Sequence, residues 1–88
     1  MNEPAGLFES GRQVLMSDWD PIGIRDVPQA RDEYDDYARQ IARTLAAGTS
    51  TADLSKRLLE IETASMGLPG NRERANAAAR KLWRIANP

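Results

Sequence analysis

Acidic side chains carry most of the chemical potential of this 88-residue sequence, because it contains no cysteine and no histidine. Without these two residue types, thiol nucleophiles, disulfides, the usual zinc ligands and the usual general base near neutral pH are excluded. Acid–base chemistry or cation binding would therefore depend on carboxylates. Three places combine carboxylates with an informative pattern, namely residues 18–26, residues 32–36 and Glu62.

Residues 18–26 can be compared with a calcium-binding loop. The aspartates and Gly23 of this segment fall at loop positions 1, 3, 6 and 9, but Ile22 falls at position 5 and Gln29 at position 12, where a bidentate Glu is required. Because two ligands are missing, we predict no metal site. We expect instead a tight loop in which aspartates cap turns and in which Trp19 and Ile22 pack on the body of the protein.

Asp32, Asp35 and Asp36 form a second acidic group. Paired carboxylates can perform acid–base catalysis or bind a metal. On a helix, however, these three would lie opposite the apolar stripe of residues 34–41, where acids in the first turns complement the helix dipole and pair with arginines nearby. We therefore predict a solvated face, and we name it with Arg80 and Arg84 as a candidate surface for a partner.

Glu62 is an acid inside an apolar pattern. At about 100° per residue it falls between Leu58 and Leu59, where a carboxylate is costly unless it is hydrogen-bonded or paired. We predict a structural latch, in which a buried Glu62 accepts hydrogen bonds from backbone N–H groups of residues 19–24 or from an arginine. The predicted latch residues are Glu62, Trp19, Asp20, Gly23 and Arg25.

The alternative interpretation of Glu62 is a carboxylate with a perturbed pKa in a pocket. The sequence supplies neither a histidine, nor a cysteine, nor a second convergent group to support such a site. We therefore predict that the protein is not an enzyme, and that it has no catalytic residue, cofactor or metal.

Helical periodicity, interrupted by glycine and proline, defines the elements that must position these side chains. The predicted helices span about 3–17, 29–47, 51–66 and 72–86. Gly48 ends the second helix, Ser50 or Thr51 caps the third, with Asp53 three residues after Ser50, and Asn71 caps the fourth. No strand alternation is present. We predict an all-α fold, a compact bundle of four helices with a structured loop between helices 1 and 2, as a single domain over residues 1–88.

Charge is distributed unevenly along the chain, although the net charge is −1. Residues 18–36 hold seven acids and two bases, whereas residues 71–88 hold five bases and one acid. The two segments either neutralise each other in the fold or steer a charged partner. We expect four basic side chains to point away from the apolar face of the fourth helix: Arg74, Arg80, Lys81 and Arg84.

Three stretches occur together: Trp-Asp-Pro-Ile-Gly at 19–23, Asp-Glu-Tyr-Asp at 32–35 with Tyr37, and Ile-Glu at 61–62 followed by Met-Gly-Leu at 66–68. Over roughly residues 10–86, the chain thereby resembles a family of small bacterial helical domains of unknown function. The resemblance implies an all-α, cytoplasmic bacterial protein. It implies no catalytic residue.

The function predicted from these features is a small cytoplasmic protein-interaction module, with a toxin-neutralising immunity protein as a specific version. The expected partner is another protein, and the chain is expected to be a monomer or a homodimer. No apolar run approaches the roughly 20 residues of a membrane helix, and the start lacks the features of a secretion signal. The alternative is a nucleic-acid-associated regulator using the basic C-terminal helix, which the pI of about 5.3 disfavours.

Overall fold

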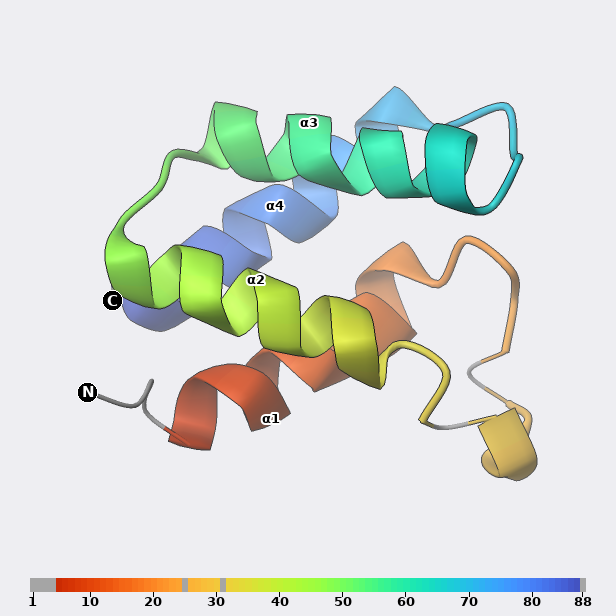
Figure 1. Cartoon of the computed structure of the whole chain (residues 1–88), viewed down its shortest axis with the longest axis horizontal. Coiled ribbons are helices and arrows are strands. Elements are labelled where there is room, and N and C mark those ends of the chain that lie inside the picture. Colours follow the sequence, from red (N-terminus) through yellow and green to blue (C-terminus); the bar gives the residue numbers. More distant parts are fainter. Residues whose placement is uncertain (1–4, 25, 31, 88) are drawn as a thin grey trace.

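Helices account for the whole architecture in the computed structural model, which describes residues 5–24, 26–30 and 32–87. The four α-helices are α1 (Ala5–Val14), α2 (Asp35–Ala47), α3 (Thr51–Glu60) and α4 (Arg72–Ala86). No β-strand occurs in the described residues. The fold is an all-α four-helix bundle, as the periodicity predicts (Figure 1).

Three shorter helical segments complete the chain. A π-helical turn, η1 (Leu15–Trp19), continues α1, and a second one, η3 (Ile61–Ser65), continues α3. A 3₁₀ turn, η2 (Pro28–Ala30), lies in the long connection between α1 and α2. The two π-helical turns are important for the site described below, because each changes the phase of the side chains that follow it.

Of the two residues predicted to cap α3, Ser50 is the cap, and the predicted cap of α4 is confirmed. The Ser50 hydroxyl accepts a hydrogen bond from the backbone N–H of Asp53 at 3.1 Å, and the Asn71 side chain accepts one from the N–H of Arg74 at 2.9 Å. Gly48 ends α2 with a φ of 95°, a conformation that favours glycine. Local hydrogen bonding by short polar side chains therefore fixes these boundaries.

Helix α4 packs against each of the other three helices (Figure 1). Its contact face consists of small residues, and Ala75, Ala78 and Ala79 are fully buried. Gly11 of α1 is also buried, and a Cβ built on it would lie 3.8 Å from Leu82 of α4. The stripe of small residues therefore allows close helix approach around one shared core.

Helix boundaries differ from the prediction where the chain is shaped by tertiary contacts. The second helix was expected from residue 29 but begins at Asp35, because the preceding chain winds as separate turns, with hydrogen bonds from Ala30 N to Val27 O and from Glu33 N to Ala30 O. The first helix reaches Trp19 rather than Ser17, through η1. Residues 3 and 4 of that predicted helix lie outside the described residues.

The described helices have the dimensions of a small folded domain. The radius of gyration is 12.0 Å, close to the value of about 12 Å expected for a compact chain of this length. A single cluster of buried hydrophobic side chains includes residues from α1, α2, α3 and α4. In the described part of the chain, no helix has both the length and the apolar character needed to span a membrane.

Candidate functional site

Glu62 is the most deeply buried charged side chain among the described residues, with an exposure of 0%. Its Oε2 accepts a hydrogen bond from the indole Nε1 of Trp19 at 2.9 Å. Its Oε1 accepts one from the backbone N–H of Asn71 at 3.1 Å and one from Nη2 of Arg74 at 2.8 Å. The carboxylate therefore has both a cationic partner and two neutral donors, which offset the cost of removing it from water.

The two π-helical turns meet at this carboxylate, since Trp19 is the last residue of η1 and Glu62 the second residue of η3. Each turn is closed by a hydrogen bond spanning five residues, from Asp20 N to Leu15 O at 2.8 Å and from Met66 N to Ile61 O at 3.0 Å. A wide turn of this kind inserts one residue into the helical register. Both helices thus depart from α-helical geometry where they are joined.

The burial of Glu62 and its contacts with Trp19 and an arginine agree with the prediction, but no described backbone N–H of residues 19–24 donates to it. Two of the loop N–H groups bind Asp20 instead, with Gly23 donating to its carbonyl at 3.2 Å and Ile24 to its carboxylate at 2.7 Å. Arg25 lies outside the described residues. The arginine that pairs with Glu62 is Arg74, which was expected to point away from the core. The reason is that the first turn of α4 packs beside η3, so its donors lie within reach.

Asp20 and Tyr34 form a second polar contact beside the first. Oδ1 of Asp20 accepts hydrogen bonds from the Tyr34 hydroxyl at 2.9 Å and from the N–H of Ile24 at 2.7 Å. The Tyr34 oxygen also accepts from the N–H of Ile22 at 3.3 Å. The rings of Trp19 and Tyr34 are 5.4 Å apart, which connects this contact to Glu62. Residues 20–24 are therefore attached to the core by side chains.

Burial raises the pKa of the Tyr34 hydroxyl above its ordinary value, because the phenolate would be poorly solvated in the core. The N–H of Ile22 lowers this pKa and the Asp20 carboxylate raises it, by accepting a hydrogen bond from the hydroxyl and by repulsion, so the net direction is upward. Tyr34 therefore remains a hydrogen-bond donor to Asp20 across the whole physiological pH range.

The acidic candidates at positions 32–36 do not share one environment. Asp32 and Asp36 are exposed, and Asp36 pairs with Arg39 at 2.9 Å. Asp35 was expected on the same solvated face, but its Oδ1 lies 2.9 Å from Nε of Arg12 in α1, and its side chain is only 19% exposed. Because α1 packs along α2, Asp35 lies at their contact and joins the two helices.

The basic candidates on α4 lie on the surface. Arg80 and Arg84 are exposed, and within the described residues neither has an ion-pair partner. Lys81, next to Arg80, pairs with Asp18 at 2.9 Å. This ion pair joins the acidic and basic segments at the surface, while Arg80 and Arg84 have none among the described residues.

The exposed large apolar side chains of the described structure are Ile22 and Val27, at 44% and 42% exposure. Trp19 is buried as expected, but the expected packing of Ile22 on the body of the protein is wrong. The Tyr34 hydroxyl binds the backbone at Ile22, which fixes the chain while its side chain faces outward. One sequence signal indicates this exposure: Ile22 and Val27 lie in a segment that contains proline and glycine and has no helical stripe.

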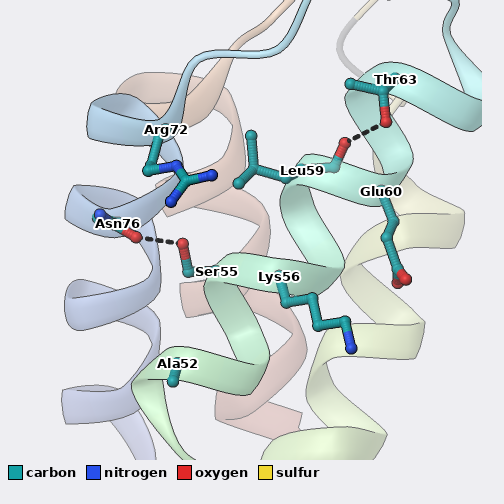
Figure 2. Close-up of a pocket in the computed structure, with 8 residues that line it drawn as sticks. All are labelled: Ala52, Ser55, Lys56, Leu59, Glu60, Thr63, Arg72 and Asn76. Carbon is teal, nitrogen blue, oxygen red and sulfur yellow. Dashed lines mark hydrogen bonds between the residues drawn. The ribbon is translucent and has the colours of Figure 1, made fainter.

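A cavity of about 420 Å³ lies between α3 and α4, on the outer side of their contact (Figure 2). The residues that line it are mostly polar: Ala52, Ser55, Lys56, Leu59, Glu60, Thr63, Arg72 and Asn76. Sequence patterning does not indicate this cavity, because it brings together residues of α3, η3 and α4 that are separated in sequence.

Carboxylates do not converge on a cation site in the part of the chain that the structure describes, where no group of three or more acidic side chains could hold a metal ion. Asp18 and Asp20, which would begin a calcium loop, instead bind Lys81, Tyr34 and backbone N–H groups. No protein-family model, curated protein or solved structure shows significant similarity to this chain.

Proposed function

We propose that this protein is a cytoplasmic, non-enzymatic module that binds another protein through the loop between α1 and α2. The contact would be made by the loop surface, which comprises Ile22, Asp26, Val27, Asp32 and Glu33, all exposed. The observation that carries the proposal is the exposure of two large apolar side chains on a loop that is fixed by buried polar contacts. Both side chains belong to the same loop, and an apolar patch left in water is typical of interaction sites.

Fixation of the loop is the first argument for binding. Asp20 accepts hydrogen bonds from Tyr34 and from the N–H of Ile24, and Glu62 holds Trp19 at the start of the loop. A loop already held in one conformation loses less entropy when a partner binds. The buried contacts around Glu62 therefore serve the loop surface by fixing its base.

Charge indicates the chemistry of the partner. Residues 18–36 hold seven acids and two bases, so the apolar side chains lie within an acidic segment. The complementary partner is a protein with an apolar hollow bordered by lysine or arginine, which such a segment would steer into contact. Enzymes that act on nucleic acids present basic surfaces of this kind. In its specific form, the proposal is that this protein is an immunity protein that binds and neutralises a toxin of this enzyme class.

The test is capture of the partner from the native lysate by three forms of the protein. The Ile22→Ser, Val27→Ser double variant removes the apolar side chains, and Ala46→Ser, Ala47→Ser is a matched control at the exposed far end of α2. We expect a discrete protein to be retained by the wild type and by the control, to be lost with the loop variant, and to resist nuclease treatment. Equal retention by both double variants would contradict the proposal.

The nucleic-acid alternative is supported by the exposed Arg80 and Arg84 of α4, which have no ion-pair partner among the described residues. It predicts a different outcome of the same experiment. Capture would then be abolished by nuclease and by the Arg80→Gln, Arg84→Gln double variant, and it would decrease steeply with salt. The loop variant would bind as the wild type does.

A further inference from the structure

Charges without an ion-pair partner lie on two different surfaces of the molecule and differ in sign. On the loop surface, Asp26, Asp32 and Glu33 are exposed, and none forms an ion pair within the described residues. On α4, the same holds for Arg80 and Arg84, which lie one helical turn apart and define what is called here the α4 edge. The molecule therefore presents an acidic and a basic surface, although its net charge is only −1.

One ion pair holds the start of the acidic loop beside the α4 edge. Nζ of Lys81 lies 2.9 Å from Oδ1 of Asp18. Lys81 is next to Arg80 and three residues before Arg84, and Asp18 belongs to η1, which packs against α4 and leads directly into the loop (Figure 1). The acidic and basic surfaces are therefore neighbours on one molecule, with this pair between them.

Neighbouring surfaces of opposite charge suit a contact between two copies of the chain. In a two-fold dimer every contact occurs twice, so the loop surface of each copy would meet the α4 edge of the other. The small net charge of each copy opposes this association little. A second copy supplies the carboxylates that the α4 edge lacks, whereas a nucleic acid on this edge would be repelled by the acids of the neighbouring loop.

We propose that this chain forms a two-fold homodimer in which the loop surface of each copy docks on the α4 edge of the other. The guanidinium groups of Arg80 and Arg84 match carboxylates with two donors each. Ile22 and Val27, at 44% and 42% exposure, are removed from water in the same contact.

Dimerisation regulates the loop surface, because it covers the apolar side chains assigned above to the partner protein. The dimer is then a resting form, and a partner that binds the loop surface shifts the equilibrium toward the monomer. This regulatory role rests on the proposed function, whereas the dimer itself does not.

The experiment is analytical ultracentrifugation of the purified full chain over a series of protein concentrations. We expect a monomer–dimer equilibrium in the wild type. The dissociation constant should rise at least about tenfold between about 20 mM and about 500 mM sodium chloride, because exposed charges are screened by salt. A wild type that stays monomeric up to about 1 mM protein, or a dimer that salt does not weaken, would overturn the proposal.

Charge reversal locates the contact. The loop variant is Asp32→Lys, Glu33→Lys, and the edge variant is Arg80→Glu, Arg84→Glu. Each variant alone should be monomeric where the wild type is dimeric, because like charges then face each other in both contacts. A mixture of the two should dimerise again, since every contact in the mixed dimer joins opposite charges. Circular dichroism verifies that each variant is folded.

A matched control separates the predicted contact from attraction by net charge. Arg43→Glu, Lys56→Glu changes the net charge as the edge variant does, but at exposed positions on α2 and α3. This control should dimerise by itself more than the edge variant does, and its mixture with the loop variant should recover less dimer than the mixture of loop and edge variants. Equal recovery in the two mixtures would refute the two-fold contact.

The dimer and the proposed function can fail separately. A monomeric wild type that still loses its captured protein in the Ile22→Ser, Val27→Ser variant would refute the dimer and leave the proposed function in place. A dimer that behaves as described, in a protein that captures nothing from the lysate, would support the dimer and refute the proposed function.

Discussion

At the scale of single residues, Glu62 is the side chain on which most depends, because three donors from three positions converge on it. We predict that Glu62→Ala lowers the free energy of unfolding by about 3 kcal/mol, the low end of the range for breaking a buried pair. The low end applies because the Arg74 side chain is 32% exposed, so water partly replaces its partner.

The amide variant tests which donors matter. In Glu62→Gln, the oxygen can still accept from Asn71 and Arg74, but the new NH₂ group faces the indole N–H of Trp19, which is also a donor. We therefore expect Glu62→Gln to lower the free energy of unfolding by about 1–3 kcal/mol, the cost of the unsatisfied group. This loss should be smaller than the loss in Glu62→Ala. Urea unfolding followed by circular dichroism measures both. A larger loss for Gln than for Ala would contradict the geometry.

Tyr34 makes stability depend on pH in the alkaline range. Because its pKa is raised in the folded state, the folded protein keeps this proton at a pH where the unfolded chain, with an ordinary pKa near 10, loses it. The stabilisation is fully present below about pH 10 and is lost as the pH rises toward the folded-state pKa.

The tyrosine prediction is checked by comparing two variants. The decrease in unfolding free energy above about pH 10 should be smaller in Tyr34→Phe than in the wild type, whereas Tyr37→Phe should retain it. At neutral pH, Tyr34→Phe should cost about 1–2 kcal/mol, since Asp20 and the N–H of Ile22 lose a partner. Identical alkaline profiles for Tyr34→Phe and the wild type would contradict the assignment.

At the scale of elements, the first turn of α2 separates carboxylates that look equivalent in sequence. We predict that replacing Asp32 and Asp36 together by Asn changes the unfolding free energy by less than about 1 kcal/mol, as exposed pairs usually do. Asp35→Asn should lower the free energy of unfolding by more than the double replacement does, because it removes the ion pair with Arg12 between α1 and α2.

Thermal unfolding of Asp35→Asn and of the double variant provides the comparison. A large loss on replacing Asp32 and Asp36, or an increase in the melting temperature of the wild type with a divalent cation, would instead indicate a cation site on this face. Equal behaviour of the two variants would mean that the pair between Asp35 and Arg12 contributes no more than exposed charges do.

At the scale of the whole molecule, contacts between distant segments join the bundle into one unit. The indole of Trp19 binds Glu62 across 43 positions of sequence, and Nε1 of Trp83 donates to the carbonyl of Thr49 at 3.0 Å. We predict that unfolding followed by far-ultraviolet circular dichroism and by tryptophan fluorescence has the same midpoint. An earlier fluorescence transition would show that α1 or the end of α4 separates before the bundle unfolds.

Local sequence signals were enough to predict the four helices and the caps at the starts of α3 and α4. The spacing of apolar residues follows the helical period of 3.6, and short polar side chains at Ser50 and Asn71 bind the N–H groups of their own helices. These signals need only a few neighbouring residues, so they can be interpreted without knowledge of the fold. The placement of Glu62 within the apolar arc of its helix was predictable for the same reason.

The pairing of side chains from different helices followed from the packing of those helices. The choice of Arg74 as the partner of Glu62, the pairing of Asp35 with Arg12 and the outward orientation of Ile22 all depend on how the helices pack. The π-helical turns at η1 and η3 further shift the register that a regular helix predicts. Contacts between residues far apart in sequence follow from helix packing, which the local period of one helix does not encode.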